Sequence, residues 1–192
     1  MIYFQGLVNA LYYGNNLEGT PFDPISNLTN SFGGQERLKR IKEFIERLRS
    51  KGGNVKIVST SWGPVTDKQW KKYLINVTSS FNLGFDESTT LSLEDPGPGL
   101  SADKGKVIKE DMVKDDIEFN EALFSDDSTG NIKSAKDVCN TLLLPKRLGL
   151  DGTDCAYMEA LVSKNSGTIP DPKITILITV VLISFQVNKN FL

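Results

Sequence analysis

Two adjacent carboxylates, Asp126 and Asp127, directly follow a short apolar run in this sequence. Small polar residues come next, a helix is expected from Asn131, and no lysine or arginine lies within five positions of the pair. Ligands of open α/β sheets bind beyond the carboxyl ends of the strands, and Mg²⁺ prefers carboxylate oxygens. The pair therefore indicates a candidate Mg²⁺ site. The alternative is an Asx turn that only caps the helix.

The composition narrows the chemistry that these acids could take part in. The 192 residues include no histidine, which excludes histidine-based nucleophilic catalysis and imidazole metal sites. A net charge of −2 does not favour nucleic acid as a partner. Cys139 and Cys155 lack the spacing of metal ligands, and nothing resembles a signal peptide, so we expect intracellular thiols in an undefined compartment. Any catalysis must rely on carboxylates, lysines, hydroxyls and a metal.

Strands and helices alternate along most of the chain. Apolar runs predict strands at Leu7–Tyr13, Asn54–Trp62, Thr89–Leu93, Phe119–Asp126 and Thr141–Leu144. Helical spacing predicts helices at Gly34–Lys51, Ser101–Lys114, Asn131–Val138 and Thr153–Val162, and another from Thr66, where Thr66 and Gln69 have capping-box spacing. This alternation indicates a parallel sheet covered by helices, in a three-layer α/β domain.

The C-terminal tail has a different composition. Ile174–Phe185 is almost entirely apolar, but its about 12 residues fall short of the ~20 that span a bilayer. An added strand, an interfacial membrane anchor and a chain end that is not native all fit this pattern. We therefore predict one α/β domain over residues 1–163 and an apolar tail of undefined structure over residues 164–192.

The motifs on these elements, taken in order, resemble the haloacid dehalogenase superfamily of phosphohydrolases over roughly residues 7–163. The second predicted strand reads Ile57-Val58-Ser59, and Ser59 resembles the family hydroxyl that holds a phosphoryl oxygen, with Thr60 as the alternative. Lys104, at the entrance of a helix, resembles the family lysine, with Lys106 as the alternative.

The acidic pair completes the resemblance. Asp126 and Asp127, with Asn131 four residues after the second acid, are similar to the family's acidic motif. Asp126 would be the Mg²⁺ ligand and Asp127 its support. The resemblance implies a Rossmann-like three-layer sandwich with a mainly parallel five-stranded sheet of order 5-4-1-2-3, and Mg²⁺-dependent hydrolysis of phosphomonoesters through an aspartyl nucleophile. A metal, a lysine and a hydroxyl would neutralise the charge on the transferred phosphoryl group.

The first predicted strand departs from the family. Aligning Leu11–Leu17 with the family motif Asp-x-Asp-x-Thr puts Tyr12 at the nucleophile and Gly14 at the second acid. A phenol with a pKa of ~10 is a poor nucleophile at neutral pH, and glycine can neither bind a metal nor act as an acid. We therefore expect little or no turnover, unless the first residues are not the natural start. A non-enzymatic binding or assembly module is the alternative.

Two expectations concern partners and access. The segments between the motifs are too short for a cap domain, so the resemblance implies an open site for a phosphorylated substrate or a protein partner. Membrane association would involve only Ile174–Phe185, and the oligomeric state is not indicated. A response-regulator-like acidic pocket is a further alternative, but it needs an aspartate at the end of the third strand, where Thr89–Leu93 is followed by Glu94-Asp95.

Overall fold

A single parallel sheet forms the centre of the molecule. The computed structural model describes residues 35–61, 66–94, 96–97, 102–144, 152–165 and 174–178. The strands are β1 (Gly53–Thr60), β2 (Thr90–Leu93), β3 (Ala122–Asp126), β4 (Asn140–Leu143) and β5 (Ile174–Ile178). They pair in the order β2-β1-β5-β3-β4, and every pair is parallel. The prediction of an α/β fold with a parallel sheet is confirmed.

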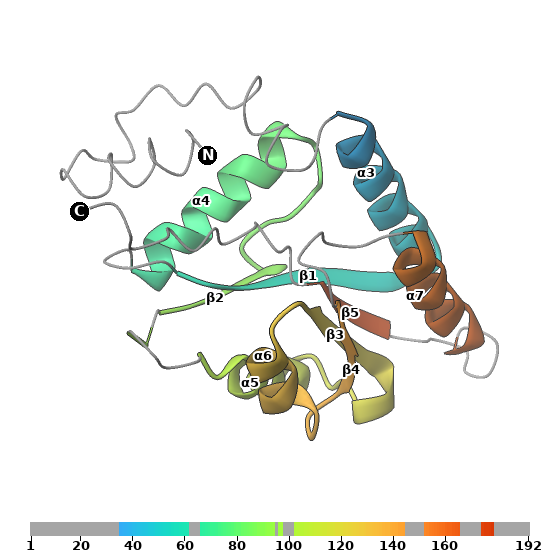
Figure 1. Ribbon diagram of the computed structural model, residues 1–192. Helices are drawn as coiled ribbons and strands as arrows, with labels where there is room; N and C mark the ends of the chain where they lie inside the picture. The colour runs from blue at the N-terminus through green and yellow to red at the C-terminus, as the bar shows by residue number, and fades with distance from the viewer. Residues whose placement is uncertain are drawn as a thin grey trace, which may run out of the picture.

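Helices cover both faces of this sheet. They are α3 (Gln35–Ser50), α4 (Asp67–Ser80), α5 (Lys104–Lys114), α6 (Thr129–Ala135) and α7 (Gly152–Asn165). Figure 1 shows α3, α4 and α7 on one side, which we call the α3/α4/α7 face, and α5 and α6 on the other, which we call the α5/α6 face. None of the helices in these described parts of the chain is long and apolar enough to cross a bilayer.

The residue pattern of β1 divides the core in two. Val55 and Ile57 pack on the α3/α4/α7 face with Leu48 and Trp70, whereas Val58 packs with residues of α5 and β3 on the other face. Successive strand residues point to opposite faces, and a strand covered on both faces needs apolar residues in succession. This is why β1 reads as a nearly unbroken apolar run.

The local signals at the helix starts are largely confirmed. The predicted capping box at α4 is present, because Gln69 N–H donates to Thr66 Oγ1 at 3.3 Å and Thr66 N–H donates to Gln69 Oε1 at 3.2 Å. The helix predicted from Asn131 begins earlier, at Thr129, since the Ser128 hydroxyl caps it by accepting from Asn131 N–H. Residues 119–121, predicted as strand, form a short 3₁₀ turn, η1, before β3.

The centre of the sheet differs from the expected order. That order placed Leu7–Tyr13 between the strands now labelled β1 and β3, but β5 occupies this position, with Ile176 level with both Val55 and Leu123. The tail thus supplies a strand, one of the three alternatives left open for it. Leu7–Tyr13, which includes Tyr12, and the following Gly14 lie outside the described residues. Both segments are apolar, and only non-local pairing decides which one fills a central position.

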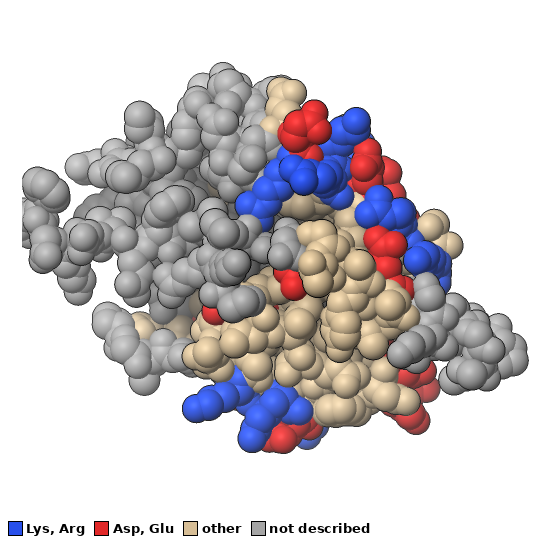
Figure 2. Space-filling model, turned by 45° about the vertical axis from the view of Figure 1, so that its right-hand side comes forward, with Lys and Arg blue, Asp and Glu red and all other residues tan. Residues whose placement is uncertain are grey.

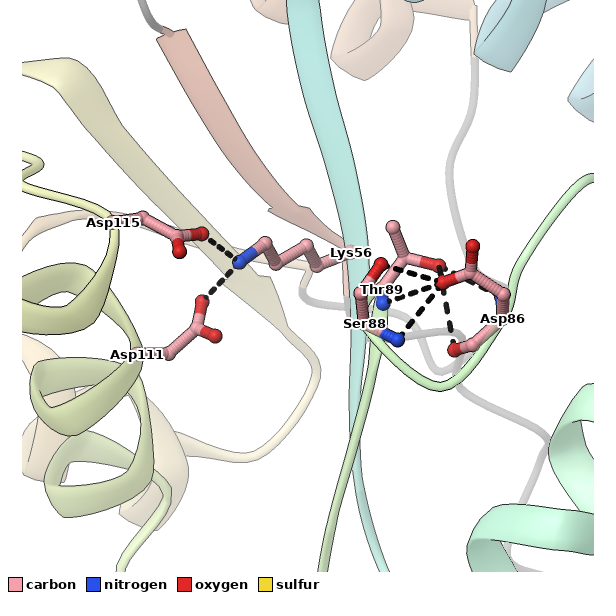
Figure 3. Close-up of polar contacts among 6 residues, drawn as sticks. All are labelled: Lys56, Asp86, Ser88, Thr89, Asp111 and Asp115. Atoms are coloured by element: carbon pink, nitrogen blue, oxygen red, sulfur yellow. Dashed lines mark hydrogen bonds and ion pairs between the residues drawn. The ribbon is translucent and has the colours of Figure 1, made fainter.

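A buried charge cluster fixes α5 to the sheet. Lys56 extends from β1 toward α5, where its ammonium donates to Asp111 at 2.6 Å and to Asp115 (Figure 3). Burial alone would lower the pKa of Lys56, but the hydrogen bonds to Asp111 and Asp115 outweigh burial and raise that pKa above its ordinary value of 10.5. The lysine therefore stays charged inside the α5/α6 face.

The loop before β2 is closed by Asp86. Its carboxylate accepts from the backbone N–H and hydroxyl of both Ser88 and Thr89 (Figure 3). The hydroxyl hydrogen bonds of Ser88 and Thr89, followed by those of the two backbone N–H groups, lower the pKa of Asp86 to about 2. The turn orients the chain as it enters β2.

The α3 surface carries both signs of charge. Figure 2 shows lysine or arginine and acidic side chains interspersed along this side of the molecule. Arg47 of α3 and Lys51, the residue that follows this helix, also pair with Glu159 of α7, at 2.9 and 3.5 Å. Exposed pairs of this kind contribute little each, so the apolar core, not surface charge, holds α3 and α7 in place.

The central position of β5 gives a first prediction. Ile176→Pro should remove a ladder hydrogen bond of the sheet interior and leave its acceptor unpaired, at a cost of at least about 1–3 kcal/mol, so the midpoint of urea unfolding should fall clearly below that of the wild type. Ile176→Val, which preserves the strand, should cost only about 0.5–1.5 kcal/mol. Unfolding of the proline variant at the wild-type midpoint would mean that β5 is not part of the folded sheet.

The charge cluster gives a second prediction. Because the folded-state pKa of Lys56 lies above the unfolded value, its contribution is complete below about pH 10 and is lost as the pH rises through the folded pKa. The free energy of unfolding of the wild type should therefore fall more steeply than that of Lys56→Met as the pH rises past the unfolded pKa of 10.5. Parallel pH profiles for the two proteins in urea would contradict the assignment.

Candidate functional site

A buried ion pair lies at the carboxyl edge of the sheet. Lys104, the first residue of α5, donates from Nζ to Oδ2 of Asp126, the last residue of β3, at 2.8 Å. The side chains are only 6% and 1% exposed. The ammonium also lies 5.9 Å from the ring centroid of Phe124, within reach of a cation–π contact. Because burial removes most of the screening by water, either charge would be strongly unfavourable without the other.

The start of α6 completes the surroundings of Asp126. Ser128 N–H donates to Oδ1 at 2.7 Å, and the Asn131 amide donates to both carboxylate oxygens at 3.1 Å. Lys104 occupies the remaining direction at Oδ2. A carboxylate has about four lone-pair positions, and these contacts use them all. The Asx turn that the sequence left open is thus formed by Asp126, in addition to its contact with lysine.

Close packing of α5 on α6 holds the lysine in place. Gly105 N–H donates to Ser134 Oγ at 3.1 Å, and Ser134 Oγ donates to the Asn131 carbonyl at 2.9 Å. A Cβ atom on Gly105 would lie 1.8 Å from the Ser134 carbonyl oxygen. Only glycine allows this approach of two backbones. A chain of contacts therefore leads from Lys104 through α6 back to Asp126.

The two candidate hydroxyls of β1 lie on opposite faces. Ser59 accepts a hydrogen bond from Trp70 Nε1 of α4 at 3.0 Å, which places it on the α3/α4/α7 face. Thr60, one residue on, shares the α5/α6 face with Val58 and with Asp126. Because β5 separates β1 from β3, the backbones of Ser59 and Thr60 lie at least two strand spacings, roughly 10 Å, from the backbone of Asp126. Ser59 is therefore not brought to Lys104, contrary to the expected clustering.

The other predicted site residues are placed as follows. Lys106, the alternative lysine, is exposed, and its backbone N–H donates to Asp103, so Lys104 is the lysine that meets the acidic motif. Asp127 follows β3 directly and is half-buried. Tyr12 and Gly14 lie outside the described residues. The structure thus brings together Lys104, Asp126 and Asn131 from three separate elements.

The donor set around Asp126 does not fit Mg²⁺ as it stands. Both carboxylate oxygens already accept hydrogen bonds, and a bound dication would lie beside the Lys104 ammonium. Magnesium needs an open coordination shell of oxygens. Across the described ranges, no three His, Cys, Asp or Glu side chains are grouped so as to hold a metal ion.

No family model matches this sequence, and no similar protein was found among curated proteins or solved structures.

Several of these contacts were not anticipated from the sequence, although signals for them exist. Gly105 inside a predicted helix and Ser134-Ala135 in another are small residues of the kind that permit close helix contacts. Lys56 interrupts an apolar run, and Asp111 and Asp115 share one helix face at i, i+4 spacing. A charge inside a buried strand must have a partner, but the sequence does not say which acid it meets.

The backbone contact at Gly105 gives a third prediction. Gly105→Ala should force α5 away from α6 and destabilise the fold by about 1–3 kcal/mol, because the added Cβ meets backbone and not a flexible side chain. Gly152→Ala is the matched control, since nothing lies within 4 Å of a Cβ added there. Equal unfolding midpoints in urea for the two variants would contradict this packing.

Proposed function

We propose that this chain is a haloacid-dehalogenase-like, phosphatase-type domain with little or no turnover of phosphomonoesters. The observation that carries the proposal is the buried contact between Lys104 and Asp126 at the carboxyl edge of a parallel sheet. A lysine at a helix entrance and an acid at a strand end are two parts that the resemblance implies. Lys104 and Asp126 come from separate motifs, 22 positions apart in the sequence, and their side chains are hydrogen-bonded to each other.

The sheet supports the same proposal at a finer level. The resemblance implies a sheet in which one central strand separates two pairs of strands. The pair β1 and β2 and the pair β3 and β4 flank the central strand in this way. Helices on both faces agree with a Rossmann-like three-layer sandwich (Figure 1). The difference is the central strand, which here is β5.

Neither the segment that the resemblance places at the centre of the sheet nor the segment that contains β5 carries the family nucleophile. Leu11–Leu17 contains no aspartate, and Ile174–Leu192 contains neither Asp nor Glu. In the family this aspartate forms an acyl-phosphate with the substrate. Removing a nucleophile usually lowers the rate by several orders of magnitude, which is why we propose low or absent turnover.

The hydroxyl role passes to Thr60 in this proposal. It shares a face with Asp126, whereas Ser59 is directed toward Trp70 and α4. A phosphoryl group beyond the sheet edge would then be met by a hydroxyl of β1 and by the ammonium of Lys104, which together supply donors for its oxygens.

A non-enzymatic binding or assembly module is the second candidate. The favouring observation is that Asp126, 1% exposed, already has its acceptor positions filled by protein groups. A buried carboxylate whose acceptor positions are all filled by protein groups acts as one half of a structural ion pair. The same scaffold would then serve to bind a protein partner.

Hydrolysis of p-nitrophenyl phosphate by the purified chain in Mg²⁺ tests the proposal. We expect a rate near the uncatalysed background, equal in wild type, Asp126→Asn and Thr60→Ala, because no carboxylate nucleophile is available. Asp137→Asn, at an exposed acid, controls for contaminating phosphatases, and circular dichroism checks the fold. Turnover that Asp126→Asn abolishes and Asp137→Asn retains would show an active enzyme and refute the proposal.

A further inference from the structure

The charge balance at Asp126 is already complete within the protein. Its carboxylate is almost fully buried and accepts from one ammonium, one backbone N–H and one side-chain amide. The net charge of the pair with Lys104 is zero. A buried carboxylate needs such a counter-charge or a metal, and here the counter-charge is covalently part of the chain.

A divalent cation and Lys104 would compete for the same oxygen. A cation bound to Oδ2 would lie within a few ångströms of Nζ, which is itself 2.8 Å from that atom, and like charges repel strongly where water is excluded. The ammonium cannot easily withdraw, because Gly105 is held against Ser134 in α6 by a backbone-to-hydroxyl hydrogen bond and by close backbone contact.

We propose that Lys104 is the resident cation of this site, so that the wild-type chain takes no divalent cation at Asp126. Removal of the ammonium, with its hydrocarbon volume retained, frees one acceptor position at Oδ2 and leaves an uncompensated carboxylate, where Mg²⁺ or Mn²⁺ would bind with water as its other ligands. This inference does not rest on the proposed function, because it concerns the charge at Asp126 whether or not a phosphoester is hydrolysed.

Thermal unfolding with and without divalent cations tests the inference. At constant ionic strength, the melting temperature of the wild type should be the same in EDTA, Mg²⁺ and Mn²⁺. Lys104→Met should melt lower in EDTA, because it leaves a buried carboxylate unpaired. Saturating Mn²⁺ should then raise its melting temperature by about 5 °C or more, since a ligand of the folded state stabilises it.

Two control variants separate this effect from a general change of charge. Lys106→Met removes the same charge two residues away at an exposed position, and should show no response to Mn²⁺. Lys104→Met combined with Asp126→Asn should lose the rescue, because the carboxylate that would hold the cation is gone.

Two results would overturn the inference. One is saturable binding of Mn²⁺ or Mg²⁺ by the wild type, measured by calorimetry, that Asp126→Asn abolishes. The other is a Lys104→Met protein that is folded but indifferent to both cations. If Lys104→Met does not fold in EDTA, its refolding in Mn²⁺ supports the inference and a failure to refold contradicts it, while the calorimetry of the wild type remains decisive.

Discussion

The buried contact between Lys104 and Asp126 constrains the arrangement of three elements. An ammonium and a carboxylate that are 6% and 1% exposed would each be strongly unfavourable alone. The entrance of α5, the end of β3 and the first turn of α6 must therefore meet at one point. Gly105 and Ser134 make this possible by letting two backbones touch. The same closure that fixes the pair also fills the acceptor positions of Asp126.

The site also depends on a strand from the far end of the chain. β5 pairs with β1 on one side and with β3 on the other, and so joins the two halves of the sheet. Crossover connections between parallel strands are almost always right-handed, and α7, the helix before β5 in the chain, lies on the face that also carries α3 and α4 (Figure 1). The distance between β1 and β3, and with it the separation of Thr60 from Asp126, is set by this insertion.

Features that depend on a local residue pattern, such as helix caps and strand ends, could be predicted from the sequence. Features that depend on pairing between distant segments could not. The capping box at Thr66, the helix entrance at Lys104 and the strand ending at Asp126 follow from spacing within a few residues. The choice of Ser59 over Thr60 depended on a one-residue register, which reverses the face of a side chain. The resemblance places Leu7–Tyr13 at the centre of the sheet, but the apolar tail offers the same pattern, and composition cannot rank two such segments.

The most direct test of this account is a double-mutant cycle on the pair, read from the free energy of unfolding in urea. Lys104→Met and Asp126→Asn should each cost roughly 3–5 kcal/mol, because each leaves one buried group without its partner. The double variant should cost clearly less than their sum, with an interaction energy above about 1 kcal/mol. Two additive single effects would show that the pair does not hold α5, β3 and α6 together.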